Sequence, residues 1–554
     1  MRRTLHVIGA LIVALASIGS AYARSAVPWT TLNVKADSDG TSGNGSDNAD
    51  ALNHLLDHVP PGTTIKGDCK DVNGNDRVIR IAGRWLLQSN LKIVLDQGCR
   101  VACDWITAGK GGCISQADLN TPLTNVSIEG LHFVRANPNF LGRGLQLWID
   151  HLTMKSLTID GFYSMATLRG GDQEWASPSF INSPGGAGNV ATGTTTAGFH
   201  HLGNLNNGVM PATTAGRPAN VWLHDGYFEK TGDGALQVGP PCQVGTDWTS
   251  ISSDSYLYEN TTVNSDNGNM ILIATGAQDG TQSALSCDHV TVKNILIRNI
   301  TGTTKTSVIR IQHANNPDGI FQNITIRNVT GDNDAGQSAS GAVLVRGYDH
   351  SPMSDILLSD IRVMKQFGNC LDLGAAPATG LIFDNLVCDI PKSGALATAV
   401  VRSTTGTVIR NSTLPSLNGG GIELGPNRVP ACTPTNCTLP RRINDGDFQV
   451  TAPRLLNNTF SNVGNAGLDN SGAAIRLRNV AGGRVGNNIL LRNPAATDAV
   501  GISLQPGDTT NPGTTDIIVS GNTLPEMNAP TNVICAPSQG NTVNNNTDAR
   551  PPHC

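Results

Sequence analysis

Three neighbouring stretches decide the fold: His289-Val-Thr-Val-Lys-Asn294, Val308-Ile-Arg-Ile-Gln312 and Asn323-Ile-Thr-Ile-Arg-Asn328. In each stretch apolar and polar residues alternate, which is typical of a short β-strand with one buried face. The first and third stretches end in asparagine, which tolerates the left-handed backbone conformation of a tight turn. The pattern therefore predicts short strands that are joined by asparagine-closed turns.

The same two kinds of strand alternate along most of the chain. One series runs from Asn125-Val-Ser-Ile-Glu-Gly130 to Asp516-Ile-Ile-Val-Ser-Gly-Asn522, and the other from Gly234-Ala-Leu-Gln-Val-Gly239 to Gly501-Ile-Ser-Leu-Gln505. A repeat of roughly 25 to 35 residues is what the coils of a parallel β-helix require. A β-propeller has a similar period but needs four strands per blade and more aromatic residues. We therefore expect an all-β protein, a single-stranded right-handed parallel β-helix solenoid.

The beginning of the chain has the pattern of an export signal. Arg2 and Arg3 precede an apolar run, and the small-residue pattern Ala21-Tyr22-Ala23 follows it. The run is shorter than the roughly 20 residues that a membrane span needs. We expect cleavage after Ala23 and a secreted or periplasmic protein.

A solenoid needs its first coil covered, and Asp47-Asn-Ala-Asp50 followed by leucines predicts a short capping helix there. The expected organisation has four parts: a signal peptide over residues 1–23, an N-terminal cap over 24–60, the β-helix over 61–525 and a disulfide-closed tail over 526–554.

Twelve cysteines in an exported chain predict disulfides. Pairs that are close in the sequence are the candidates: Cys99 with Cys103 or Cys113, Cys370 with Cys388, Cys432 with Cys437, and Cys535 with Cys554. The cysteine spacings do not match those of a zinc site, so we expect no structural metal.

The composition limits the classes of partner. The net charge is -5, and the sequence has no basic stripe of the kind that nucleic-acid binders carry. No later stretch is apolar enough to cross a bilayer. We expect neither nucleic acid nor membrane as partner, and a monomer with both ends capped.

Strand alternation indicates where chemistry can lie. In the strand around Arg310 the isoleucines point inward, whereas Arg310 and Gln312 point outward. The same alternation in the stacked strands aligns Gln237 and Asp372 with Arg310 in one outward-facing column. It aligns Arg346 with Gln312 in a second column. These side chains are candidates for binding an extended polymer.

Aromatic residues gather in the middle of the chain, where flat rings suit stacking on sugars. Trp175 and Tyr227 are the candidates for substrate contact. We therefore expect a polysaccharide as the substrate.

A family resemblance follows from three stretches: Thr291-Val-Lys-Asn-Ile-Leu-Ile-Arg-Asn-Ile-Thr301, Val308-Ile-Arg-Ile-Gln312 and Phe321-Gln-Asn-Ile-Thr-Ile-Arg-Asn-Val329. They resemble the polygalacturonases of glycoside hydrolase family 28, within the wider pectate-lyase-like superfamily that includes phage tailspikes. In that family an Arg-Ile-Lys triplet holds the substrate carboxylate. Arg310 matches the arginine, and Gln312 replaces the lysine.

The resemblance also implies catalytic positions. Asp233 matches the first residue of the family's paired aspartates, and Gly234 replaces the second. Asn269 stands where the family has a histidine. With Asp233 as one carboxylate, Asp266 is the candidate for the second that inverting glycoside hydrolysis requires.

Two other functions remain open. A polysaccharide lyase would use an arginine or calcium to neutralise a uronate carboxylate, and a base to remove the adjacent proton. The candidates for these roles are Arg310, Arg346, Lys230, His313, the pair His200-His201 and the cluster Tyr348-Asp349-His350. A non-catalytic binding protein or adhesin is the third possibility. We expect a glycoside hydrolase without a cofactor, and calcium only if the protein is a lyase.

Overall fold

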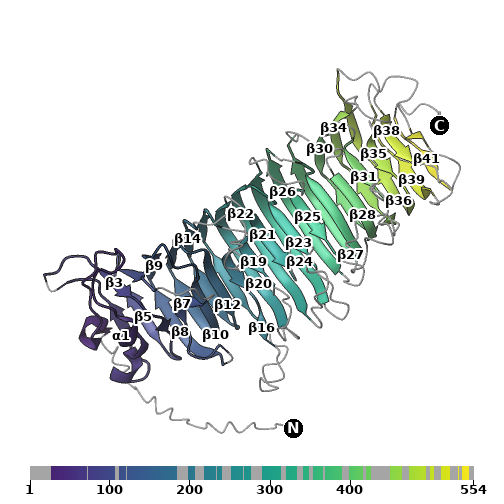
Figure 1. The fold of residues 1–554 in the computed structure, drawn as a ribbon. Helices are drawn as coiled ribbons and strands as arrows, with labels where there is room; N and C mark the ends of the chain where they lie inside the picture. The colour runs from purple at the N-terminus through teal and green to yellow at the C-terminus, as the bar shows by residue number, and fades with distance from the viewer. Residues whose placement is uncertain are drawn as a thin grey trace, which may run out of the picture.

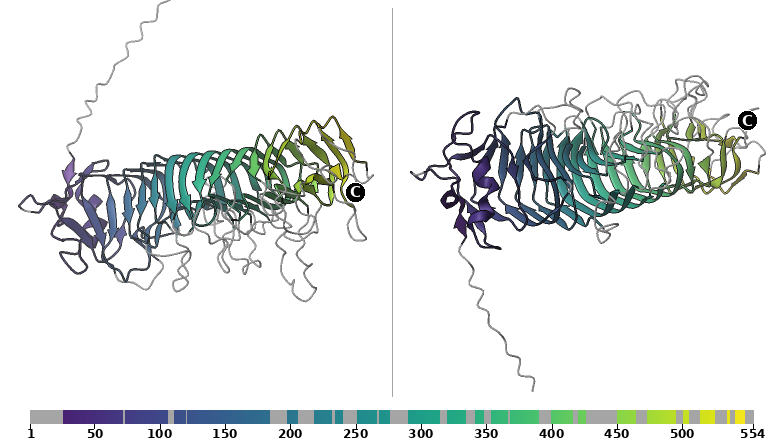
Figure 2. Two further views of the ribbon diagram at one scale, coloured as in Figure 1. Left: turned by 90° about the horizontal axis from the view of Figure 1, so that it is seen from above. Right: turned by 60° about the horizontal axis from the view of Figure 1, so that its bottom comes forward.

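The structure, a computed structural model, describes residues 26–71, 73–105, 111–119, 121–183, 197–205, 218–231, 234–239, 251–265, 268–275, 290–313, 320–333, 341–347, 353–365, 368–389, 399–415, 420–425, 450–463, 473–494, 500–504, 513–524, 534–535 and 540–547. Over these residues the chain forms the predicted all-β parallel β-helix (Figure 1). The coils stack into a long rod, with the first and the last described strands at opposite ends of it (Figure 2). The signal-peptide prediction lies outside the described residues.

Each coil contributes strands to three sheets, which we call sheets A, B and C. Sheet A contains β4 (Trp85–Leu86), β7 (Gly112–Ser115), β12 (Ser164–Arg169), β15 (Ala197–His201), β19 (Gly234–Val238), β21 (Asn269–Ala274), β23 (Ile309–Gln312), β25 (Val343–Arg346), β31 (Ile422–Leu424), β35 (Ala473–Leu477), β38 (Val500–Leu504) and β40 (Ile534–Cys535).

Sheet B contains β1 (Val27–Pro28), β2 (Ile65–Gly67), β5 (Lys92–Leu95), β8 (Leu123–Glu129), β13 (Gln173–Ala176), β17 (Val221–His224), β29 (Val408–Arg410), β32 (Val450–Thr451), β33 (Arg454–Leu456), β36 (Val480–Gly486), β39 (Thr515–Ser520) and β41 (Thr542–Asn544). Sheet C contains β3 (Val78–Ile81), β6 (Arg100–Cys103), β9 (His132–Arg135), β11 (Thr158–Asp160), β14 (Ser179–Ile181), β18 (Tyr227–Glu229), β30 (Thr413–Pro415), β34 (Thr459–Val463) and β37 (Ile489–Arg492).

Several longer strands bend from one sheet into the next. They are β10 (Arg143–Lys155), β20 (Ile251–Ser265), β22 (Thr291–Thr304), β24 (Ile320–Asp332), β26 (Met353–Met364), β27 (Leu371–Cys388) and β28 (Ala399–Thr405). The short strand β16 (Asn204–Leu205) pairs antiparallel with β20, whereas the long ladders are parallel.

The bends occur at residues with left-handed backbone conformation, most of them asparagine or aspartate. Asn260, Asn299 and Asn328 occupy the same corner in successive coils, with φ of 52°, 57° and 52°. Each amide nitrogen donates to the side-chain oxygen of the previous coil, at 2.9 Å between Asn299 and Asn260 and 2.8 Å between Asn328 and Asn299. The asparagine-closed turns predicted from the sequence are therefore confirmed.

A second asparagine ladder lies inside the C-terminal half of the rod. The side-chain amides of Asn458, Asn488 and Asn522 are buried, and each donates to the next residue of the ladder, ending at Asn546. Their distances are 3.0, 2.9 and 2.8 Å. The ladder satisfies polar groups that would otherwise be costly to bury.

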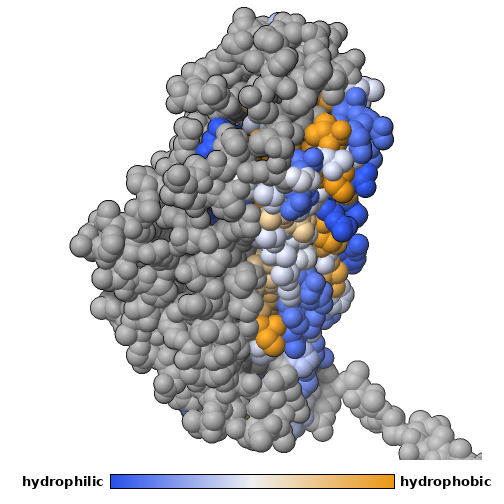
Figure 3. All heavy atoms as spheres, turned by 90° about the vertical axis from the view of Figure 1, so that its right-hand side faces the viewer, coloured by the Kyte–Doolittle hydropathy of each residue, from blue (hydrophilic) through white to orange (hydrophobic). Residues whose placement is uncertain are grey.

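The core is built from columns of inward-pointing side chains. Beneath sheet A, Val238, Ile273, Ile311, Val345 and Leu373 stack in successive coils, and all are fully buried. On the side of the rod that faces the viewer in Figure 3, hydrophilic residues separate the exposed hydrophobic ones.

The predicted N-terminal cap is present. A 3-10 helix, η1 (Trp29–Leu32), is followed by α1 (Ala49–Asn53) and η2 (Leu55–His58). Leu52 and Leu55 are buried, and the Asp47 carboxylate accepts the backbone N–H of Ala49 at 3.0 Å. The predicted domain boundaries remain predictions.

Three disulfides lie among the described residues: Cys69–Cys99, Cys103–Cys113 and Cys370–Cys388. The last was predicted. The expected partners of Cys99 are wrong, because the Cα of Cys69 lies 5.0 Å from that of Cys99 although 30 residues separate them in the sequence. Cys432, Cys437 and Cys554 lie outside the described residues, and with them the other two predicted pairs.

Candidate functional site

The outward side of sheet A contains the strip of residues that alternation predicted. Parallel pairing of β19, β21, β23, β25 and β27 aligns Gln237, Leu272, Arg310, Leu344 and Asp372 in one column. In Figure 1 these strands lie side by side along the middle of the rod. Sheet A therefore holds the candidate binding residues in consecutive coils.

Arg310 and Gln312 point outward from the same strand and contact each other. The Nε and Nη2 groups of Arg310 donate to Oε1 of Gln312 at 3.1 and 2.8 Å. Gln312 is buried, whereas Arg310 is half-buried. The glutamine therefore fixes the direction of the guanidinium fork.

Arg346 lies beside Gln312 in the next coil and pairs with Asp372. Its Nη2 is 2.9 Å from Oδ2 of Asp372, whose side chain is buried. The Asp372 carboxylate is thus paired with another residue of the strip, and this ion pair holds the Arg346 side chain in place.

Gln237 is buried, and its Oε1 has no hydrogen-bond partner among the residues that the structure describes. The neighbouring Gly234 leaves little space, since a Cβ there would lie 3.1 Å from this Oε1 and 3.2 Å from Cδ2 of Leu272. An aspartate at position 234 would therefore require the side chains of Gln237 and Leu272 to shift by a few tenths of an ångström.

A second basic cluster, which the sequence analysis missed, lies towards the N-terminal end of sheet A. Arg143 at the start of β10 and Arg169 at the end of β12 both lie close enough to His200 of β15 for their charges to act on it. Burial lowers the pKa of Arg143, and burial together with Arg143 lowers the pKa of Arg169 to about 10. Two guanidinium groups thus converge from opposite edges of the sheet in a poorly solvated place.

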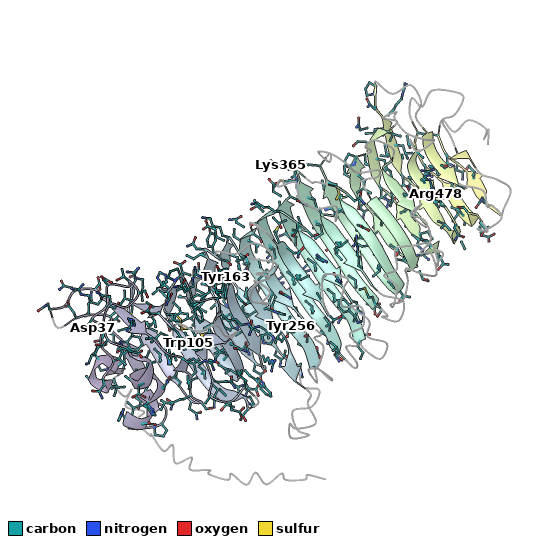
Figure 4. The ribbon with its side chains drawn as sticks, in the orientation of Figure 1. Asp37, Trp105, Tyr163, Tyr256, Lys365 and Arg478 are labelled. Atoms are coloured by element: carbon teal, nitrogen blue, oxygen red, sulfur yellow. A yellow bond between two sulfur atoms is a disulfide. The ribbon has the colours of Figure 1, made fainter. Side chains whose placement is uncertain are left out.

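A third group of charges lies near the C-terminal end of the rod, where Figure 4 labels Arg478. Glu423 of β31 pairs in register with Arg476 of β35, and Nε of Arg478 lies 3.8 Å from Oε1 of Glu423. Arginine therefore recurs along the outer side of sheet A, near both ends and in the middle.

The two predicted catalytic residues, Asp233 and Asp266, lie outside the described residues. In the sequence Asp233 directly precedes β19, and Asp266 lies three positions before β21. The starts of these two strands are paired, Gly234 with Asn269. Their roles remain predictions.

The prediction for Trp175 is wrong. Its side chain is fully buried, it packs edge-on against Phe199, and its Nε1 donates to Gln173 at 3.1 Å. Tyr256 and Tyr258 are also buried, and Figure 4 labels Tyr256 in the middle of the rod. These rings build the core rather than a sugar-binding surface.

Tyr227 is exposed but lies on sheet C, a different side of the coil from Arg310. Its hydroxyl donates to Oε2 of Glu229 at 2.9 Å. It therefore does not join the strip on sheet A.

The histidine pair is unsuited to the proton abstraction of a lyase. His201 points into the core, where its Nδ1 accepts the hydroxyl of Tyr256 at 2.7 Å and the N–H of Gly203 at 3.2 Å. Burial lowers the pKa of His201 to about 3 and that of His200 to about 4. Groups with such pKa values are weak bases at neutral pH.

The remaining lyase candidates are only partly described. His313 is buried and stacks on Phe321, with 4.7 Å between ring centroids, whereas Tyr348-Asp349-His350 lies outside the described residues. Within the described ranges, no group of three or more His, Cys, Asp or Glu side chains is arranged to hold a metal ion. None of the described helices is long and apolar enough to cross a membrane.

No family model matches the chain, and no curated protein sequence matches it either. Among solved structures it is similar to tailspike protein 3 of bacteriophage CBA120, with 9% identity, a TM-score of 0.36 and coverage of 95% of this chain but 62% of the tailspike.

Two further similar structures are enzymes. The A-module of an Azotobacter vinelandii mannuronan C-5 epimerase has 13% identity, a TM-score of 0.36 and coverage of 91% of this chain and 99% of the module. The family 28 exopolygalacturonase of Yersinia enterocolitica has 11% identity, a TM-score of 0.35 and coverage of 95% of this chain and 78% of the enzyme. At these values none of the similarities assigns the chain to a family.

Proposed function

We propose that the protein is an exported glycoside hydrolase that binds an acidic polysaccharide along the outer side of sheet A. The observation that carries the proposal is the recurrence of arginine on this side of the rod: Arg143, Arg169, Arg310, Arg346, Arg476 and Arg478. Asp372 and Glu423 lie among them and hold Arg346 and Arg478. Arginine forks recognise carboxylates through paired hydrogen bonds.

The spacing of the clusters suits an extended polymer. Four coil-to-coil steps separate the strand of Arg169 from that of Arg310. With about 4.8 Å per step, the two lie about 19 Å apart along the rod. A polymer lying along the rod axis would meet both clusters, whereas a single sugar would meet only one.

For the chemical step we propose Asp233 and Asp266 as the general acid and general base. Inverting hydrolysis places such carboxyl groups roughly 6.5 to 9.5 Å apart, one protonating the leaving oxygen and the other activating water. The position of both residues in the sequence, just before two neighbouring strands of sheet A, supports this assignment. Binding by the flanking arginines would hold the scissile bond between them.

The experiment that tests the proposal is incubation of the mature protein with polygalacturonate, alginate and neutral glycans. New reducing ends without ultraviolet absorbance from unsaturated uronates would support the hydrolase. Reducing ends with that absorbance would make the protein a lyase and move the chemistry to Arg310 and Arg346. Binding to acidic glycans without either product would leave a binding protein, and absence of binding would contradict the role of sheet A.

The disulfides fit an oxidising compartment. With the signal peptide predicted from the sequence, they support a proposed location in the extracellular medium or the periplasm.

A further inference from the structure

Sheet B carries an exposed tryptophan that is rigidly held. Trp222 of β17 is 41% exposed, whereas Trp29, Trp85, Trp148 and Trp175 are buried. Because an indole loses hydrophobic stabilisation when it is left in water, a fixed and exposed ring is a candidate contact surface.

Residues from three successive coils hold the Trp222 ring in place. Nε1 of Trp222 donates to Oε1 of Glu259 at 3.0 Å, and Glu259 is buried. The other oxygen of Glu259 accepts Nε of Arg298 at 2.6 Å and Nη2 at 2.5 Å. The chain Trp222–Glu259–Arg298 crosses β17, β20 and β22, so the indole cannot turn without breaking a buried, charge-assisted network.

A histidine supports the ring from one side. The imidazole of His224 stacks on the indole with 4.1 Å between centroids and 27° between planes. Nδ1 of His224 lies 2.8 Å from Oδ2 of Asp225, and its Nε2 lies 3.6 Å from Oε1 of Glu174. Glu174 also pairs in register with Trp222 in the preceding coil. The result is a flat apolar ring beside carboxylate and imidazole groups.

These groups indicate the class of ligand. The apolar face of a pyranose can pack on a preorganised indole, while its hydroxyls can donate to carboxylates. Glu174 and Asp225 lie beside His224 and Glu259 lies beside the indole, and Arg298 pairs with only one of these three carboxylates, Glu259. A uronate would be repelled here, in contrast to sheet A.

We propose that Trp222, His224 and Glu174 form a second saccharide-binding site, on sheet B, that takes neutral sugar units. This site would bind a neutral glycan, or the neutral part of a mixed one, without contributing to the chemistry on sheet A. It does not depend on the protein being an enzyme.

The test is calorimetric titration of the full-length mature protein with neutral hexasaccharides of glucose, mannose and xylose, and with a hexamer of galacturonate. We expect Trp222→Ala to weaken the binding of a neutral hexasaccharide by roughly tenfold and to leave galacturonate binding unchanged. Trp222→Phe should retain part of the affinity, because a ring remains.

Tyr227→Ala provides the matched control, since Tyr227 is 40% exposed on the neighbouring sheet C. It should not change neutral-sugar binding. The proposal is overturned if the wild-type protein binds none of the neutral hexasaccharides, if Trp222→Ala binds them as the wild type does, or if Tyr227→Ala causes the same loss. Thermal unfolding of each variant shows whether the fold is intact.

Discussion

Gln312 accepts two hydrogen bonds from Arg310 through a single oxygen, with Nε and Nη2 at 3.1 and 2.8 Å. The family that the sequence resembles has a lysine at the position of Gln312, which would add a charge there. In this protein Gln312 carries no charge and instead orients the charged guanidinium group of Arg310. The binding strength of sheet A should therefore depend on an uncharged residue.

We expect Gln312→Leu to weaken the binding of a galacturonate hexamer by about tenfold, because a hydrogen bond to a charged group contributes about 1.5 kcal/mol or more. Calorimetric titration measures the effect. Gln312→Glu should retain the orientation of Arg310 but oppose the anionic ligand. Unchanged affinity in Gln312→Leu would show that Arg310 is oriented by other contacts.

The N-terminal basic cluster should affect only long ligands. The double variant Arg143→Ala/Arg169→Ala should weaken the binding of galacturonate polymers that reach both clusters, about 19 Å apart, and leave shorter oligomers unaffected. Dissociation constants measured as a function of oligomer length provide the test. Arg362→Ala/Arg454→Ala, which removes two exposed arginines from sheets C and B, controls for net charge. An equal loss at all lengths would contradict a separate subsite.

Asp233→Asn should abolish turnover and leave the midpoint of thermal unfolding nearly unchanged. The reason is that amide and carboxylate have the same shape, while only the acid can exchange the proton that hydrolysis requires. Reducing-end release and calorimetry measure the two properties. Asp360→Asn, at a left-handed turn that asparagine also favours, should preserve both. A large loss of stability in Asp233→Asn would instead assign Asp233 to turn closure.

Buried histidines should make the fold sensitive to acid. His200 and His201 have pKa values lowered from 6.5 to about 4 and about 3, so they remain neutral in the folded state where the unfolded chain already binds protons. Above pH 6.5 these histidines do not lower the free energy of unfolding, whereas below it that free energy falls progressively, until about pH 4 for His200 and about pH 3 for His201. Urea unfolding at a series of pH values measures this loss.

The double variant His201→Leu/Tyr256→Phe should reduce that dependence by the part that His201 contributes, while the part due to His200 remains. It replaces the imidazole with a residue that matches its column neighbours, Leu168 and Val238, and removes the hydroxyl that would lose its acceptor. Tyr256→Phe alone should keep the wild-type slope. If the double variant keeps the full wild-type slope, His201 does not contribute to the acid sensitivity.

The fold was predictable because the sequence features that specify it lie within single coils. The repeat of alternating strands and the asparagine at each corner are visible within one coil, and parallel pairing then fixes which residues stack. The same reasoning could have placed Trp175 correctly. Asp172-Gln-Glu-Trp175 pairs with Asn220-Val-Trp-Leu223, so Trp175 shares the inward position of Leu223.

Other features depend on contacts between coils that spacing does not reveal. Cys69 and Cys99 pair because they lie one coil apart, although 30 residues separate them in the sequence. The electrostatic coupling of Arg143 and Arg169 joins residues at opposite ends of two paired strands. No sequence motif indicates that these two arginines lie close together.

The buried asparagine ladder has an evolutionary consequence. The two inner members, Asn488 and Asn522, each donate to the next asparagine and accept from the previous one, so the ladder makes the same hydrogen bond on both sides of each of these coils. A gene duplication that inserts one whole coil would find matching joints on both sides and would need no new core. The length of the rod beyond sheet A's central strands could thus change in steps of one coil, without altering the spacing of the basic clusters around Arg169 and Arg310.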